Sequence, residues 1–149
     1  MSKKITFYVY RFASDLIKDL NCKDTVLSKA EENILIQDAI RSKSKQARKT
    51  LVNAYLKSSI LTSARCYARH RLDLLDVKFN EVFEAGFIGL YRAISLLKKK
   101  PVNMPLKYFV SLMVENGALE EIIKIIKYMS LAVKDVEGMN RLAHQKKGR

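Results

Sequence analysis

The chain has 149 residues, enough for one domain that buries a core without disulfide or metal staples. Nearly half of it (48%) is apolar, which argues against a fully disordered chain. Lysine and arginine (28) outnumber aspartate and glutamate (15), so the formal net charge is +13. Such an excess costs self-repulsion, and we expect a negative partner: nucleic acid first, then an anionic membrane surface or an acidic protein face. A basic surface without such a partner is the plain alternative.

The composition predicts an all-α fold, a compact multi-helix domain, because glycine and proline number only five and two. Cys22 and Cys66 have no ligand-like spacing, so we expect reduced thiols rather than a disulfide or a metal site. The short apolar run at the start does not make a signal peptide, and no stretch approaches the ~20 apolar residues of a membrane span. We expect a cytoplasmic protein with no membrane association, no cofactor and no metal.

Residues 1–26 are predicted to form an N-terminal segment, and its helix is expected to begin near Phe7. A strand-like alternation competes there with helical spacing, and we prefer the helix because a lone strand has no partner. Ser28 and Glu31 form a capping box for a helix that ends near Ile40. After a basic turn at 41–45, a long helix is predicted from Gln46, with an apolar stripe at Val52, Leu56, Ile60, Ala64 and Tyr67.

A linker is predicted at 69–76, after which Asn80 is the expected N-cap of the next helix. That helix should end at the lysine run 98–100, which Pro101 follows. Pro105 is expected in the first turn of a further helix, and the pair Asn116–Gly117 predicts a kink or break in it. The apolar pattern fades after residue 133. We therefore divide the chain into the N-terminal segment, a domain over 27–133 and a basic, mobile tail over 134–149.

The segment Gly86–Ala93 reads Gly-Phe-Ile-Gly-Leu-Tyr-Arg-Ala, and Glu81 followed by two apolar residues precedes it. It resembles the Gly-x-Ile-Gly-Leu-x-Arg-Ala core of the second conserved region of bacterial sigma factors. Ala47–Leu56 is similar to the helix that opens that region, and Leu27–Glu32 is similar to the start of the preceding one. The resemblance covers Leu27 to Ile123 and implies the helical bundle of sigma region 2.

The resemblance also implies docking on core RNA polymerase, at a coiled coil of the largest subunit. In the family, acidic and polar residues before the glycines make that contact, and the role falls here to Glu81, Glu84, Gly86 and Asp76. Two glycines in one helix, Gly86 and Gly89, cost about 1 kcal/mol each relative to alanine. A helix tolerates that where another backbone approaches closely. An internal helix crossing and a partner surface are equally open interpretations.

Promoter DNA is the second partner that the resemblance implies. The candidate nucleic-acid contacts are Tyr108, Lys107, Lys98, Lys99, Lys100 and Arg92. The lysine run could also join Lys43, Lys45, Arg48 and Lys49 in a phosphate-binding face.

The chain departs from the sigma pattern in its polymerase and DNA contacts. The family's Gln-Glu pair is Glu84-Ala85 here, which alters one polymerase contact and deletes another. There is no tryptophan; Ser111 and Leu112 stand where the family stacks two on flipped bases, leaving Tyr108 to stack and Phe109 for the core. The helix that should read DNA carries three carboxylates, which repel phosphate: Glu115, Glu120 and Glu121. No helix-turn-helix follows this helix.

No catalytic constellation stands out, and we do not expect an enzyme. His70 and His144 lie far apart, Asp73 and Asp76 lack a second carboxylate cluster, and no glycine-rich phosphate loop is present.

Three functions remain. The first is a short sigma-like factor that docks on core polymerase and engages promoter DNA, alone or with a second protein that supplies the missing module. The second is a sigma-derived protein that occupies the polymerase clamp and redirects or inhibits transcription. The third is a basic helical domain that binds nucleic acid non-specifically. We favour the first because Tyr108 and the basic surface remain.

Overall fold

The computed structural model describes residues 3–22, 27–70 and 78–147, with side chains at 8–22, 27–70, 78–128 and 138. These residues form five α-helices and one 3-10 helix, with no strand among them, which confirms the predicted all-α class. The elements are α1 (Lys3–Asp19), α2 (Lys29–Arg41), α3 (Lys45–Arg69), α4 (Phe79–Ser95), η2 (Leu97–Lys99) and α5 (Leu106–Lys147).

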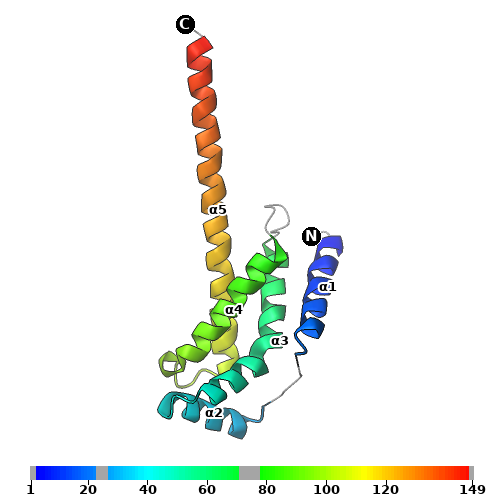
Figure 1. Ribbon diagram of the computed structural model, residues 1–149, viewed down its shortest axis with the longest axis vertical. Coiled ribbons are helices and arrows are strands. Elements are labelled where there is room, and N and C mark those ends of the chain that lie inside the picture. Colours follow the sequence, from blue (N-terminus) through cyan, green and yellow to red (C-terminus); the bar gives the residue numbers. More distant parts are fainter. Residues whose placement is uncertain (1–2, 23–26, 71–77, 148–149) are drawn as a thin grey trace.

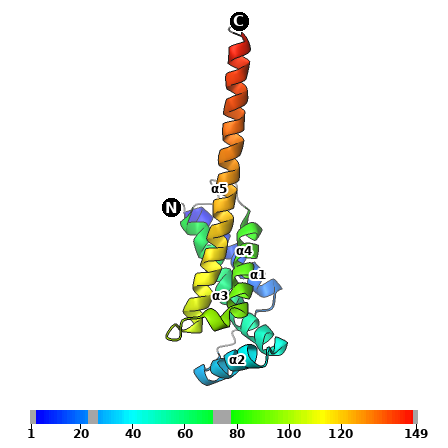
Figure 2. The ribbon, with the colours of Figure 1, turned by 90° about the vertical axis from the view of Figure 1, so that its left-hand side faces the viewer.

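The body of the molecule is built around α3, α4 and α5, which all pack on one another. Helix α1 lies along α3, and α2 packs on the other end of α3 (Figure 1). Helix α5 is much longer than the rest, and its C-terminal half leaves the body and projects well beyond it (Figure 2). The candidate sites must therefore be sought on the body, where helices from distant parts of the sequence meet.

Serine caps begin both α2 and α3. The Ser28 hydroxyl accepts a hydrogen bond from the Glu31 amide (3.2 Å), and the Ser44 hydroxyl accepts one from the Ala47 amide (3.1 Å). Between them Lys43 adopts a left-handed backbone conformation (φ 49°), which reverses the chain at the end of α2. The predicted bounds of these two helices therefore hold to within one residue.

Three predicted helix ends were wrong. Helix α1 begins at Lys3 rather than near Phe7. The N-cap of α4 is Lys78 rather than Asn80, because the Lys78 amide donates to the Glu81 carboxylate (3.3 Å). At its other end α4 stops at Ser95, and the lysine run continues in η2, a tighter turn that buries Leu97 in the core.

The predicted break at Asn116–Gly117 is also wrong, because α5 runs without interruption to Lys147. A Cβ on Gly117 would lie 2.6 Å from the Ala85 carbonyl oxygen of α4, so this glycine permits a close helix crossing and does not end the helix. The backbone of 134–147 is helical too, where we had predicted a mobile tail. This stretch contains no proline and a single glycine, Gly138, so few residues in it disfavour a helix.

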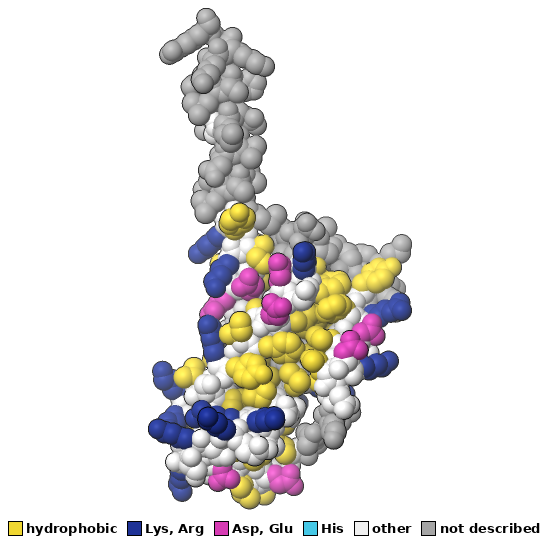
Figure 3. Space-filling view, in the orientation of Figure 1, with side chains coloured by type: hydrophobic (Ala, Val, Ile, Leu, Met, Phe, Trp, Pro, Cys, Tyr) yellow, Lys and Arg dark blue, Asp and Glu magenta, His cyan; other side chains and the backbone are white. Residues whose placement is uncertain are grey.

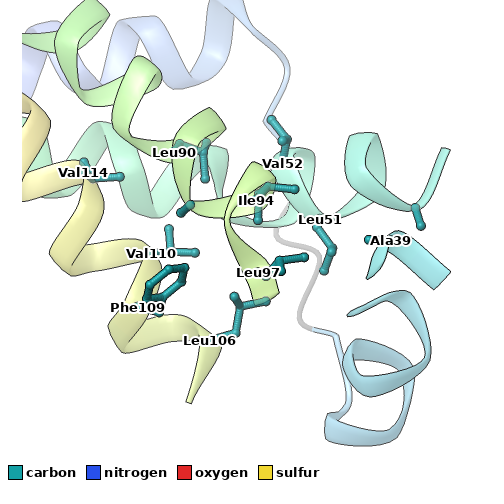
Figure 4. Packing of buried hydrophobic residues seen from close by; sticks show 12 residues of the cluster. Ala39, Leu51, Val52, Leu90, Ile94, Leu97, Leu106, Phe109, Val110 and Val114 are labelled. Carbon is teal, nitrogen blue, oxygen red and sulfur yellow. The ribbon is translucent and has the colours of Figure 1, made fainter. Parts of the chain in front are cut away.

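Two buried clusters hold the body together. In one, aromatic rings from α1, α3 and α4 interlock: Phe12 lies 5.2 Å from Phe79 and 5.4 Å from Phe83, and Tyr67 meets Phe79 edge-on at 4.8 Å. The other joins α2, α3, α4, η2 and α5 through aliphatic side chains (Figure 4), with Leu51, Leu90 and Leu106 almost completely buried. The predicted stripe of α3 faces these clusters, as its periodicity requires.

Candidate functional site

The side of α4 that faces away from the core carries an exposed seam, which we define as Glu81, Glu84, Ile88 and Tyr91. These residues are spaced three, four and three apart, so they lie on one face of the helix. Both carboxylates are exposed, and Ile88 and Tyr91 are 52% and 59% exposed. The seam thus has an acidic end and an apolar end on one rigid element.

Large exposed apolar side chains are the informative part of this seam, because α4 has a fully formed core face of its own on the opposite side. In the space-filling view, hydrophobic side chains gather across the middle of the body, with acidic ones beside them, and lysines and arginines lie at the lower end and along the sides (Figure 3). The two glutamates were predicted from the sequence, whereas Ile88 and Tyr91 were missed. Their helical spacing from Glu84 was a signal that could have found them.

Glu81 has a second task in the fold. Its carboxylate accepts a hydrogen bond from the Lys78 amide and lies in the first turn of α4, where negative charge is favoured by the helix dipole. Glu84 is exposed on the next turn and has no such duty. Asp76, the remaining acidic candidate, lies outside the described residues.

The glycines of the motif face inward. Gly86 is buried, and a Cβ there would collide with the Ser63 hydroxyl of α3. A Cβ on Gly89 would meet the Met113 carbonyl oxygen and would lie 2.8 Å from the Val114 Cα of α5. Of the two open interpretations, the internal crossing therefore holds. Gly86 offers no surface for a partner, and its placement among the docking residues is corrected on that ground.

The lysine run divides into two environments. Lys98 and Lys99 are exposed on η2, while Lys100 is half-buried and donates through Nζ to the carbonyl oxygens of Met104 (2.8 Å) and Pro101 (3.2 Å). Lys100 thus fastens the loop before α5. Lys98 and Lys99 have no such bond among the described contacts and face solvent, where a phosphate could reach them.

Two carboxylates of α5 are paired with arginines. Arg92 lies 3.4 Å from Glu120, and Arg69 lies 3.6 Å from Glu115. These pairs are largely exposed, so they stabilise the fold only slightly. They reduce the repulsion toward phosphate that we expected of this helix, and they also occupy Arg92, one of the predicted nucleic-acid contacts.

The first turns of α5 place Tyr108 and Lys107 on the surface. Tyr108 is 65% exposed, whereas Phe109 beside it is 7% exposed and belongs to the core. Ser111 is half-buried and Leu112 exposed. Tyr108 is the one exposed aromatic ring between residues 106 and 113, all of which the structure describes. Base stacking at this place would therefore rest on a single ring.

A basic cavity, only partly predicted from the sequence, lies at the lower end of the body. Residues from α2, α3 and η2 meet there, and Lys43, Arg48 and Lys98 line it together. A larger cavity of ≈ 740 Å³ opens between α2, α3 and the loop before α5; Tyr55, Glu32 and Met104 are among its lining residues. Burial, and then the hydrogen bond to Glu32, raise the pKa of Tyr55 well above its usual value.

The thiols are free, and burial raises the pKa of Cys66, so this thiol stays protonated at neutral pH. In the described part of the chain, no three or more His, Cys, Asp or Glu side chains gather in a way that could hold a metal ion. None of the helices searched there combines the length and apolar character that a membrane span requires.

Comparisons with protein-family models, with curated proteins and with solved structures found no match to this chain. Function must therefore be inferred from the exposed seam of α4, the basic surface and the sequence motif that α4 carries.

Proposed function

We propose that this protein is a sigma-like transcription factor, which docks on core RNA polymerase through the seam of α4 and engages promoter DNA beside it. The observation that carries the proposal is the seam itself. A helix that presents residues at alternating spacings of three and four forms the kind of surface that packs against another helix in a coiled coil. The sigma-like motif of residues 81–93 coincides with it.

The charges of the seam support a helical partner with basic residues. In a chain of net charge +13, the two exposed carboxylates on consecutive turns of α4 make one end of the seam locally acidic, as Asp15 and Asp19 do on α1. Opposite charge at one end and apolar packing at the other would fix the orientation and register of the partner. The buried glycine crossing behind the seam holds α4 rigid, so little conformational entropy is lost on docking.

Engagement of DNA is supported by Tyr108, Lys107, Lys98 and Lys99, which are all exposed. The ring of Tyr108 supplies one stacking platform, and the lysines supply phosphate contacts. The pairing of Glu115 and Glu120 with arginines removes part of the repulsion from α5.

The second candidate is a sigma-derived protein that occupies the polymerase clamp without melting DNA. It is favoured by the same single ring: stacking contributes about 1–3 kcal/mol per base, and one platform gives little driving force for holding several bases out of a duplex. Both candidates share docking through the seam, and they differ only in whether the docked protein opens DNA.

The test is co-purification with bacterial core RNA polymerase in ~0.3 M salt, which suppresses loose electrostatic association. The wild-type chain should co-purify, and Glu81→Lys combined with Glu84→Lys should abolish binding while helical content by circular dichroism stays the same. Because Glu81 also caps α4, a second variant, Ile88→Ala with Tyr91→Ala, tests the seam without touching the cap. It should lose binding as well.

The matched control is Asp15→Lys with Asp19→Lys, an identical charge reversal at two exposed positions of α1. It should bind like the wild type; an equal loss there would mean that bulk charge, not the seam, governs association. For chains that bind, transcription from a promoter template with core polymerase then separates the two candidates. Transcripts support the first, and docking without transcripts supports the second.

A further inference from the structure

The basic cavity at the lower end of the body has a volume of ≈ 180 Å³. It lies where the end of α2, the first turns of α3 and the end of α4 with η2 come together. At roughly 30 Å³ per water molecule, it is too large to be a site for one structural water. Its lining residues are Ala39, Ile40, Lys43, Arg48, Ile94, Ser95, Leu97 and Lys98.

Arg48 supplies the observation that points to a ligand. Its Nε atom is buried, and it has no hydrogen-bond partner among the described residues. A guanidinium stays charged at any accessible pH, so its N–H cannot relieve the deficit by losing a proton. A charged group that is partly shielded from water and lacks a hydrogen-bond partner at one N–H is costly to bury, and an anion in the adjoining cavity would offset that cost through its charge.

The charged side chains among the described lining residues are all cationic. Lys43 and Lys98 line it with Arg48, and among the described residues no carboxylate lines it. The left-handed backbone of Lys43 and the adjacent Ser44 amide, which donates to the Asp38 carbonyl oxygen (3.2 Å), fix the backbone turn from which the Lys43 side chain extends. The fold thus brings together cations from positions 43, 48 and 98, and their mutual repulsion favours an anion between them.

We propose that this cavity binds a phosphate group, held by Arg48, Lys43 and Lys98. Arginine and lysine together match the several acceptor oxygens of a tetrahedral phosphate. The apolar floor of Ile40, Ile94 and Leu97 lowers the local dielectric and strengthens each contact. The exposed Lys45 and Lys49 continue the basic surface along α3, so the phosphate of a nucleic-acid backbone is the source we favour. That source rests on the proposed DNA engagement, whereas the site itself does not.

The experiment uses the full chain labelled with ¹⁵N and follows the arginine Nε–Hε signals by NMR. Arg48→Lys identifies the signal of Arg48 by its disappearance. Titration with inorganic phosphate in low-chloride buffer should shift that signal saturably. Lys43→Gln with Lys98→Gln should weaken phosphate binding about tenfold or more, since each lysine makes a charge-assisted contact. Both lysines are exposed, so this variant should keep the wild-type circular dichroism spectrum.

Lys124→Gln with Lys127→Gln is the matched control, because it removes the same charge from exposed positions of α5. Its phosphate affinity should be unchanged. The absence of a saturable Arg48 shift, or equal weakening in both lysine pairs, would overturn the site whatever the polymerase experiment shows.

A second titration with short single-stranded and duplex DNA decides the source of the phosphate. If DNA moves the Arg48 signal and inorganic phosphate competes with it, the cavity holds a backbone phosphate. If phosphate binds but DNA leaves Arg48 unmoved, the ligand is a free phosphate compound, and the nucleic-acid assignment of this site fails while the site stands.

Discussion

The crossing of α4 with α5 and the junction of α2 with α3 are packed in opposite ways. At the crossing, backbone meets backbone: Gly89 would place a Cβ 2.8 Å from the Val114 Cα, and Gly117 one 2.6 Å from the Ala85 carbonyl oxygen. At the junction, a cavity of ≈ 740 Å³ opens between α2, α3 and the loop before α5, and the Tyr55 hydroxyl of α3 donates to the Glu32 carboxylate of α2 at its edge (2.8 Å).

The crossing of α4 with α5 is therefore a rigid frame, whereas α2 is attached to the body through side chains. Close-packed backbones have no way to adjust, so the crossing should open only when the whole domain unfolds. Helix α2 is held by few buried side chains and by the hydrogen bond from Tyr55 to Glu32, so we expect it to detach and unfold first. The seam lies on α4, which belongs to the frame, whereas α2 supplies part of the wall of the basic cavity.

The largest effect is expected from Gly89→Val, which forces a branched side chain into the backbone of α5. We expect a loss of about 3 kcal/mol or more in the free energy of unfolding, because neither backbone can move without breaking the crossing. Urea unfolding followed by circular dichroism measures it. Gly138→Ala is the control, since nothing lies within 4 Å of a Cβ there. It should keep or slightly raise the midpoint, because alanine is the better helix former and meets no neighbour there. A Gly89 variant as stable as that control would refute the tight crossing.

Gly86→Ala should have a smaller effect that depends on a single neighbour. The new methyl group would collide with the Ser63 hydroxyl, which is buried and donates to the Ser59 carbonyl oxygen (2.9 Å). We expect a cost of about 1–3 kcal/mol. In a Ser63→Ala background most of that cost should vanish, because the Ser63 Cβ lies at an ordinary 3.4 Å. Strictly additive losses in the double mutant would show that Gly86 is needed for some other reason.

The sequence predicted the helices of the body well, because their apolar stripes and the Ser28 cap are local signals. It also located the close approach, since two glycines in one helix are costly unless something needs the space. It could not say what approaches. That Gly86 faces Ser63 and Gly89 faces Val114 follows from the crossing of three helices, and Gly117 gave the same local signal as a helix break.

The candidate site was predictable to a similar degree. The exposure of Glu84 follows from the core positions of α4, and Ile88 and Tyr91 could have been found by the same spacing. The pairing of Arg92 with Glu120, and the meeting of Arg48 with Lys98, join residues 28 and 50 positions apart (120 − 92 and 98 − 48). Only the tertiary fold determines such meetings, and no local pattern contains them.

The smallest effect is expected from Tyr55→Phe, which removes the polar bond that holds α2. The loss should be about 1 kcal/mol at pH 7, the usual net contribution of one hydrogen bond. The raised pKa of Tyr55 fixes the pH dependence: its contribution is fully present below the unfolded phenol's pKa of about 10 and falls as the pH rises through the folded value. The stability gap between wild type and variant should therefore narrow above pH 10 in urea unfolding.

Amide hydrogen exchange at neutral pH supplies the sharper measurement. Exchange should quicken in α2 and stay unchanged in α4, because α2 opens without the frame. A uniform increase over all helices would mean that α2 and the crossing unfold as one unit, and the contrast between the two regions would be wrong.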